Sequence, residues 1–308
     1  MRYAVCGSYL SFILFSFLFC FSTSSIAQVD ATYISAFGES LSAKVYGGYA
    51  LTSLTRKYGS ASDETYIPNV PPYFGLGGSW KGIGGSISYG FAFANPHEKE
   101  VRSEYLDLQL HYYGDRIVFD FFGQRYKGFS LQDDVIDRFY PDIGVLKLGG
   151  YLQYNFNYRR FSFPAAFDQS KKQMKSAGTP MASVAFYYTK INADSLYTEE
   201  ILGNRTNYVF GPSGGYAYTF VFGNNYFATG SLSFGLHACL DAVSGRAGVC
   251  PTFFPRISSG YNGETWALAV TAQYNVVYVS FVEGEDEMAL GTMDGRIVFT
   301  RRFGGAVH

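Results

Sequence analysis

The sequence has few charged residues and, beyond its first 27 positions, no apolar run as long as a membrane-spanning helix. Charged residues make up 16% of the chain and the net charge is −1, so the sequence carries no basic footprint for nucleic acid. A transmembrane helix needs about 20 predominantly apolar residues. If this chain crosses a membrane, it must therefore cross with strands closed into a barrel.

Cysteine is also scarce, and half of it lies in a segment that we expect to be removed. Arg2, the apolar run Leu10–Phe21 and small residues before a cleavage after Ala27 form the pattern of a secretory signal peptide over residues 1–27. Cys20 leaves a lipoprotein signal open as an alternative, although the large residues before it do not suit that cleavage.

The mature chain is expected to begin at Gln28 and keeps two cysteines, Cys239 and Cys250, on either side of a short loop. Export removes the reducing environment, which favours a disulfide between them. Two free thiols at strand ends are the alternative.

Aromatic residues and glycine are abundant instead. Tyr and Phe supply nearly all of the 19% aromatic content, and there are 35 glycines. Tyr and Phe suit pleated surfaces, whereas Gly permits tight reversals. The composition therefore predicts a chain of strands and turns.

The stretch Tyr105–Tyr126 shows the pattern most clearly. Residues Tyr105, Asp107, Gln109, His111 and Tyr113 alternate with Leu106, Leu108, Leu110 and Tyr112, and the alternation resumes after Gly114-Asp115. A period of two predicts a hairpin with one apolar face and one polar face. No helical segment is predicted that could cover the apolar face, so lipid is its expected partner.

Twelve strands of about ten residues are predicted, a length that suits a tilted spanning strand. They begin near Leu41, Tyr73, Ile83, Tyr105, Arg116, Val145, Ala182, Val209, Tyr226, Phe253, Trp266 and Arg296. Short turns such as Lys81-Gly82 and Asn262-Gly263 alternate with long polar loops, predicted at 127–142, 192–207 and 283–292.

These observations predict an all-β fold: an antiparallel transmembrane β-barrel of about 12 strands, with short periplasmic turns and long extracellular loops. The barrel would span residues 41–303, after a lead-in at 28–40 and before a tail at 304–308. Arg296–Phe303 looks like the aromatic-ended last strand that signals outer-membrane assembly. A soluble two-layer β protein stays open as an alternative.

Several segments together resemble one known family. They are YLDLQ, DFFGQRYKGF, RFSFPAAFDQ, KSAGT, GPSGGYAYTFVF, YFATGSLSFGL and ISSGYNGETWALAV. They are similar to an outer-membrane β-barrel family of Bacteroidetes-type bacteria that is classed as a domain of unknown function, and the resemblance covers Tyr33–Phe303. It implies an envelope location and a barrel. It implies no activity and no catalytic residues.

The polar faces of the predicted strands define a candidate lumen. Its members are Asp107, Gln109, His111, Arg116, Asp120, Gln124, Lys147, Gln153, Asn155, Arg256, Gln273, Asn275, Arg296 and Arg302. Both signs of charge occur, as expected for a small barrel filled by internal ion pairs. A packed polar core, a narrow passive pore and a ligand site all remain open.

A catalytic interpretation has weak support. His111 and His237 are the histidines on predicted strands, and Ser231, Ser233 and Ser258 are nearby hydroxyls. A membrane-embedded lipid hydrolase could use such a pair, but no serine lies in a nucleophile motif. No catalytic residue is assigned and the chain is not expected to be an enzyme.

Metal and phosphate sites also lack the necessary spacing. The acidic runs Asp133–Asp137 and Glu283–Glu287 could gather a hard cation but do not have the spacing of a ligand loop. Gly211–Gly215 lacks the lysine and helix of a phosphate loop. Neither a metal site nor a cofactor is assigned.

The segment Phe161–Thr179 is too long for a short turn. It is expected either to fold inward and plug the lumen, with the lysines of Lys171–Lys175 facing Asp107 and Asp120, or to be an ordinary turn.

The sequence thus predicts a bacterial outer-membrane barrel that is structural or a narrow passive pore, with a lipid hydrolase and a surface ligand-binding or adhesin barrel as alternatives. The expected partners are outer-membrane lipid, lipopolysaccharide and the outer-membrane assembly machinery. No solute is identified.

Overall fold

The computed structural model describes residues 29–38, 41–57, 64–69, 72–90, 103–131, 138–193, 203–282 and 286–304. Its elements are β1 (Ile34–Ala36), β2 (Leu41–Lys57), β3 (Glu64–Ile67), β4 (Tyr73–Trp80), β5 (Ile83–Gly90), β6 (Glu104–Tyr113), β7 (Ile117–Leu131), β8 (Arg138–Asn155), α2 (Phe163–Phe167), β9 (Lys171–Gln173), β10 (Ala177–Ala193), β11 (Arg205–Phe222), β12 (Tyr226–Asp241), β13 (Ala247–Asn262), β14 (Trp266–Val282) and β15 (Asp286–Phe303). The predicted signal peptide, most of the predicted tail, the run Asp133–Asp137 and residues 283–285 of the second acidic run lie outside the described residues.

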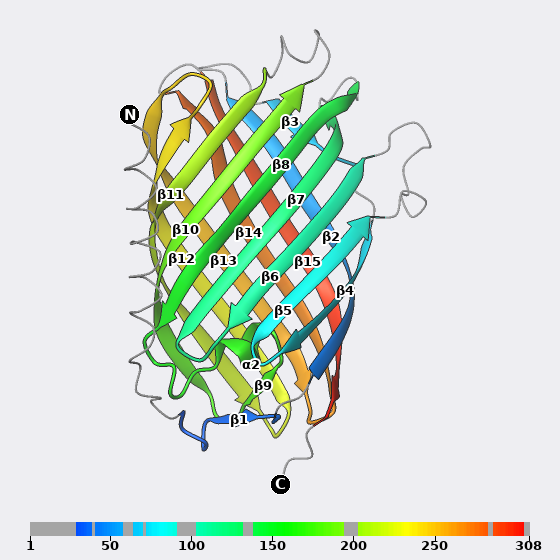
Figure 1. Ribbon diagram of the computed structural model, residues 1–308, viewed down its shortest axis with the longest axis vertical. Coiled ribbons are helices and arrows are strands. Elements are labelled where there is room, and N and C mark those ends of the chain that lie inside the picture. Colours follow the sequence, from blue (N-terminus) through cyan, green and yellow to red (C-terminus); the bar gives the residue numbers. More distant parts are fainter. Residues whose placement is uncertain are drawn as a thin grey trace, which may run out of the picture.

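Twelve antiparallel strands close into one barrel (Figure 1). The order round the wall is β2, β4, β5, β6, β7, β8, β10, β11, β12, β13, β14 and β15. The ring closes because β15 pairs with β2, from Glu287 opposite Lys57 to Phe303 opposite Leu41. The short strand β3 joins β2 to β7 beyond the ends of β4–β6. The predicted barrel of about twelve strands is confirmed.

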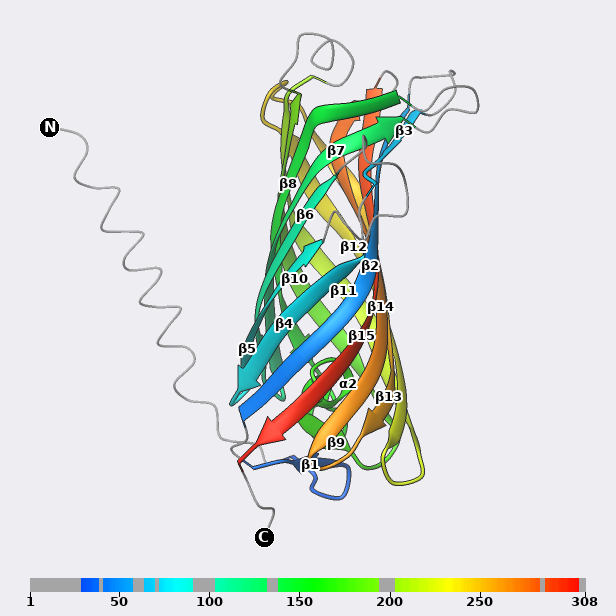
Figure 2. The same ribbon diagram turned by 90° about the vertical axis from the view of Figure 1, so that its right-hand side faces the viewer.

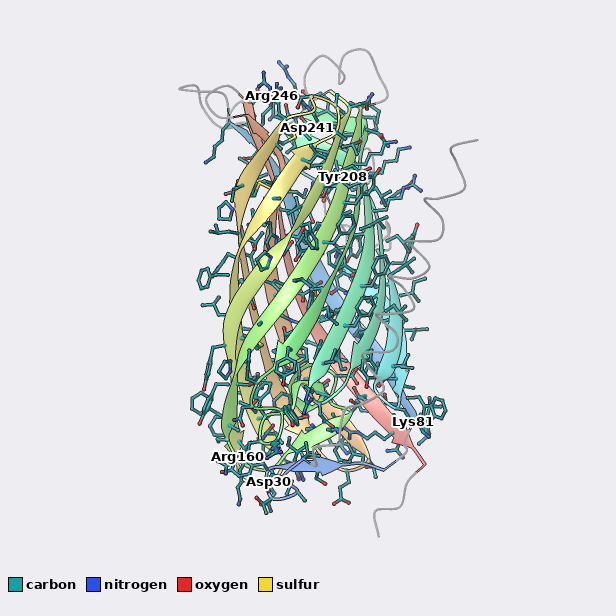
Figure 3. The ribbon with its side chains drawn as sticks, turned by 60° about the vertical axis from the view of Figure 1, so that its left-hand side comes forward. Asp30, Lys81, Arg160, Tyr208, Asp241 and Arg246 are labelled. Atoms are coloured by element: carbon teal, nitrogen blue, oxygen red, sulfur yellow. A yellow bond between two sulfur atoms is a disulfide. The ribbon has the colours of Figure 1, made fainter. Side chains whose placement is uncertain are left out.

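The outer face of the wall is apolar because every second residue points outward. On β12 these residues run from Tyr226 to Leu240 and are all apolar or glycine, and Phe234 and Leu236 are well exposed. The stick view shows such side chains along the outside of the wall (Figure 3). Within the described part of the chain, no helix has the length and hydropathy to cross a membrane. The chain is an antiparallel transmembrane β-barrel.

The two ends of the barrel differ. One end, called the turn end below, carries the tight reversals after β4, β6, β11 and β13, and the opposite end is the loop end. Lys81 and Arg160 lie at the turn end, whereas Asp241 and Arg246 lie at the loop end (Figure 3). At the tightest turn, Lys81 and Gly82 adopt φ angles of 50° and 83°, a left-handed conformation that glycine takes without strain.

Most strands are longer than the ten residues predicted. Nine of the twelve wall strands have 15 to 18 residues, and they extend into the loops predicted at 127–142, 192–207 and 283–292. The prediction stopped each strand where the outward face ceases to be apolar. The strands continue because their inward side chains still pack against one another.

That inward packing forms an apolar cluster in the loop-end half of the lumen. Its members are Tyr46, Ala50, Leu54, Tyr66, Tyr73, Tyr105, Tyr126, Phe129, Tyr140, Ile143, Val145, Ile191, Met288, Leu290 and Val298. They come from eight strands, and Leu54, Tyr66 and Phe129 have no exposed surface. We call this set the apolar cluster. Its side chains pack against one another inside the lumen, as in the core of a soluble protein.

Cys239 and Cys250 form a disulfide between β12 and β13, as the sequence favoured. Their Cα atoms are 6.1 Å apart, and both side chains are buried on the lumen side. The bridge is diagonal, because Cys239 pairs with Gly248 and Cys250 with His237 in the ladder.

Replacing both cysteines by serine is expected to lower the free energy of unfolding by about 2 to 3 kcal/mol, because the disulfide closes a short loop in the unfolded chain. Urea unfolding of the folded band on an unheated gel would measure the loss. The matched control is the wild type treated with reductant, which should lose the same amount. Equal stability of all three samples would contradict the prediction.

Candidate functional site

The turn end of the lumen is filled by the connection between β8 and β10. We call residues 158–175 the plug. It folds into the barrel around α2 (Figure 2). Ser162 caps this short helix by accepting a hydrogen bond from the Ala165 amide at 3.2 Å. Gln173 accepts from the Ser162 amide at 2.9 Å and donates to the Arg160 carbonyl at 2.6 Å. Of the two outcomes left open for Phe161–Thr179, the inward fold is the one observed.

A single carboxylate ties the plug to the wall. Asp168, at the C-terminus of α2, is paired with Lys44 of β2, lies 3.2 Å from Nε2 of His111 and accepts a hydrogen bond from Ser79 at 3.1 Å. Burial by itself would raise the pKa of Asp168, but the charge of Lys44 and the hydrogen bonds from His111 and Lys44 outweigh it. They hold the pKa of this carboxyl well below its usual range.

Two arginines of the wall hold the remainder of the plug. The Arg256 guanidinium lies 4.5 Å from the ring centre of Phe167 and 5.4 Å from that of Phe163. Arg302, on the last strand, donates to the Gln169 carbonyl and to Oδ1 of Asn262. The plug is thus held by charge, by cation–π contact and by backbone hydrogen bonds.

The predicted partners of the plug lysines were wrong. Lys171 pairs with Asp115 at 2.5 Å and Lys172 donates to Asn225 at 2.7 Å, so both side chains face the turns of the barrel rim and not Asp107 or Asp120. The reason is that β9 pairs with β1 of the N-terminal lead-in beneath the barrel (Figure 2). The only plug carboxylate, Asp168, enters the lumen in their place.

Between the plug and the apolar cluster lies a cavity of about 110 Å³. Its charged and amide-bearing lining residues are Lys44, Gln109, His111, Asp120, Gln124, Lys147, Asp168, Gln169, Arg256, Gln273, Asn275, Asp294 and Arg296. The cavity has room for several water molecules or one small polar group. It is the candidate functional site.

The three carboxylates of the cavity are matched by polar or cationic neighbours. Asp168 has Lys44, and Asp294 lies 3.2 Å from Nε of Arg296. Asp120 accepts hydrogen bonds from Tyr113 at 2.5 Å and from Tyr151 at 3.3 Å.

Lys147 and Arg256 differ from the other basic side chains of the cavity, because among the described residues neither forms an ion pair with a carboxylate. The Lys147 side chain is 1% exposed, and its ammonium donates to Oδ1 of Asn275 at 2.7 Å, from β8 across the lumen to β14. The Phe122 ring lies 5.5 Å away. Among the described residues, no carboxylate is within ion-pair distance of this ammonium. The site thus contains a buried amino group with no carboxylate partner among the described residues.

The predicted lumen residues occupy three environments. Gln109, His111, Asp120, Gln124, Lys147, Arg256, Gln273, Asn275 and Arg296 line the cavity, Asp107, Gln153 and Asn155 are buried beside it, and Arg302 contacts the plug. Arg116 was placed in the lumen wrongly, because β7 begins at Ile117 and the guanidinium instead donates to the Tyr158 hydroxyl at 2.6 Å.

Lys44, Asp168 and Asp294 line the cavity but were not among the lumen residues predicted from the sequence. Lys44 and Asp294 lie on inward positions of β2 and β15, so the alternation of those strands could have found them. Asp168 has no such signal, because the plug has no strand period.

The structure also brings one serine to a histidine. Ser213 Oγ lies 3.0 Å from Nε2 of His237, whereas none of the three serines considered from the sequence bonds this ring. Nδ1 of His237 is buried without a hydrogen-bond partner within the described ranges. The pair therefore lacks the orienting group of a hydrolase triad. The described residues contain no group of three or more metal-ligating side chains.

A family model described as "Domain of unknown function (DUF4421)" matches residues 28–282. No curated protein matches the chain. Three solved structures with similar folds are the translocator domain of the autotransporter NalP from Neisseria meningitidis (12% identity, 86% of this chain and 89% of that one, TM-score 0.44), the Bordetella autotransporter BrkA β domain (11%, 84% and 98%, 0.37) and the P. putida toluene transporter TodX (6%, 90% and 94%, 0.31). These scores are too low to carry an argument about function.

Proposed function

Since the chain belongs to the DUF4421 family, which is described without an activity, we propose from its own lumen that it is a structural outer-membrane barrel closed along its axis. The bacterial host group expected from the sequence stays a prediction. The outer-membrane location is supported by the closed antiparallel wall and its apolar exterior, because strands cross a membrane only as closed barrels.

The observation that carries the proposal is that the lumen is obstructed at two separate heights. The plug fills the turn end, and the apolar cluster fills the loop-end half. Between them, Lys147 bonds Asn275 and Arg256 donates to the Tyr151 hydroxyl at 2.6 Å, each across the lumen. No displacement of the plug alone would open a water-filled path.

The test is ion current across a planar bilayer. The wild type is expected to show no current steps, and so is a variant in which residues 159–175 are replaced by Gly-Ser-Gly, because the apolar cluster still closes the lumen. Heat-modifiable gel migration and envelope fractionation would show that both barrels are folded and located in the outer membrane. An open porin reconstituted in the same bilayers is the positive control.

Steady current steps from the wild type would overturn the proposal in favour of a passive pore. Steps from the plug variant alone would show that the plug is the only barrier, which contradicts closure at two heights.

A further inference from the structure

One pair of neighbouring wall strands, β13 and β14, is paired along only part of its length. We call the boundary between these two strands the seam. β13 and β14 pair from Asn262 opposite Ala267 to Arg256 opposite Gln273, and the ladder ends there. Beyond that point, residues 247–255 of β13 are not paired with residues 274–282 of β14, although both segments are β-strand. On its other side β13 stays paired with β12 as far as Ala247. On β13, the break is therefore confined to the side that faces β14.

Two prolines explain why the seam does not close. Neighbouring residues of a strand direct their backbone groups to opposite sides, and the Asn262 amide donates to Asn225, on the β12 side. With no register shift in between, the odd-numbered residues of β13 face β14. Pro251 and Pro255 are among them and have no N–H to donate. The sequence itself thus removes two of the hydrogen bonds that a complete ladder would contain.

The unpaired part of the seam begins among outward-facing apolar side chains. Its outward side chains include Val249 and Phe253 on β13 and Tyr274 on β14, and all three are exposed. Unpaired backbone groups facing hydrocarbon cost several kcal/mol each, so spanning barrels normally close every seam. The disulfide from Cys250 to Cys239 holds β13 to β12, which leaves movement to the β14 side.

The cavity reaches the wall at the point where the ladder ends. Its lining includes Arg256 and Gln273, the last pair of the ladder, and also their neighbours Ile257 and Ala272. Ile257 also lines a groove on the outer face of the barrel. A cationic cavity and a weak, lipid-facing seam therefore meet at one place.

We propose that the β13–β14 seam is a lateral doorway from the membrane into the cavity, and that the cavity takes the anionic head of a single-chain amphiphile such as a fatty carboxylate. The head group lies at the Lys147 ammonium, and the chain extends through the seam towards the lipid. This inference rests on the proposed closure of the lumen, because a closed axis leaves the wall as the route of entry.

The chemistry of the site selects this class of ligand. Lys147 is buried, and among the described residues its amino group has one hydrogen-bond partner, the neutral amide of Asn275, so it has further N–H donors to offer an anion. The cavity accommodates a head group but not a long chain. A chain leaving through the seam would lie beside Phe253 and Tyr274, in surroundings as apolar as the membrane.

The experiment uses the full barrel in phosphatidylcholine nanodiscs and laurate carrying a ¹³C label in its carboxyl group. The wild type is expected to give a second carboxyl resonance, absent from empty nanodiscs, for laurate held at Lys147. Lys147→Gln should weaken this bound signal at least tenfold. Lys175→Gln, which changes an exposed lysine of the plug, is the matched control and should keep it.

A second variant tests whether laurate enters through the β13–β14 seam. Pro251→Val with Pro255→Val supplies the two missing donors without touching the cavity, and should slow exchange between bound and lipid-dissolved laurate at least tenfold. Pro180→Val, on the outer face of β10, should leave the exchange rate unchanged. Saturation transfer between the two resonances measures the rate.

A single resonance in the wild type, or an undiminished bound signal in Lys147→Gln, would overturn the head-group site. Unchanged exchange in the double proline variant would overturn the doorway. Failure of the proposed closure would be seen separately, as current across a bilayer.

Discussion

Replacing Asp168 by asparagine is expected to lower the free energy of unfolding by about 3 to 5 kcal/mol, because it removes one partner of a buried ion pair and leaves the other charge uncompensated. Asp168 is 1% exposed, and it holds Lys44 on one side and His111 on the other. The substitution preserves size and shape, so the loss reports the charge. Urea unfolding followed by tyrosine and tryptophan fluorescence would measure it.

The same carboxylate makes stability depend on pH. Its folded pKa lies below the unfolded value of 3.8, so the unfolded chain binds the proton more readily. The contribution of Asp168 is therefore complete above about pH 4 and is lost as the pH falls below that value. The loss of stability between pH 5 and pH 3 should be smaller in Asp168→Asn than in the wild type.

Asp115→Asn is the matched control, since it removes the partner of Lys171 from the plug's outer side. That pair is 25% and 33% exposed, so screening by water limits its expected effect to less than about 1 kcal/mol. Equal losses in the two variants would contradict the role of Asp168 as the main anchor of the plug.

Replacing Arg302 by methionine is expected to lower the free energy of unfolding by at least about 3 kcal/mol, because several buried acceptors would lose a charged donor. Its guanidinium donates to the Gly263 carbonyl and to Asn262 Oδ1, both at 2.6 Å, and to the Gln169 carbonyl. It also lies 3.8 Å from the ring centre of Phe37 in the lead-in. One side chain thus joins the last strand, the β13–β14 turn, the plug and the lead-in.

Arg301→Met is the control, because the neighbouring side chain points outward and is exposed. It should change stability by less than about 0.5 kcal/mol. Limited trypsin digestion gives a second readout: Arg302→Met should be cut in the plug, at Lys171, Lys172 or Lys175, faster than either the wild type or Arg301→Met. Equal rates of plug cleavage in all three would contradict the proposed anchor.

The wall of this barrel could be predicted from the sequence because a strand pattern is local. Alternation along Tyr105–Tyr113 assigns each side chain to a face whatever the neighbouring strands are, and tight turns such as Lys81-Gly82 fix which strands are adjacent. The strand ends were misjudged because each strand was predicted to end where its outward-facing residues cease to be apolar. Beyond the apolar belt, inward contacts such as those of Leu290 and Met288 sustain the strands.

The lumen was predicted less completely, since what fills it depends on contacts between distant parts of the chain. The alternation placed Lys147 and Arg256 inside, but Asn275 meets Lys147 only because the barrel brings β14 opposite β8. Arg116 was misplaced because it lies next to a turn. There the alternation continues in the sequence, but the side chain no longer points into the lumen.

The sequence alone determined that this chain crosses a membrane as an antiparallel barrel of about twelve strands, because period-two hydrophobicity, turn spacing and the lack of an apolar helix are all local properties. Only the tertiary structure decided that the plug, held by Asp168, occupies the lumen at one height and the apolar cluster at another. It also decided that the β13–β14 ladder ends at Arg256. These features arise from the register of strands and from charge pairs between residues more than a hundred positions apart, which no local pattern encodes.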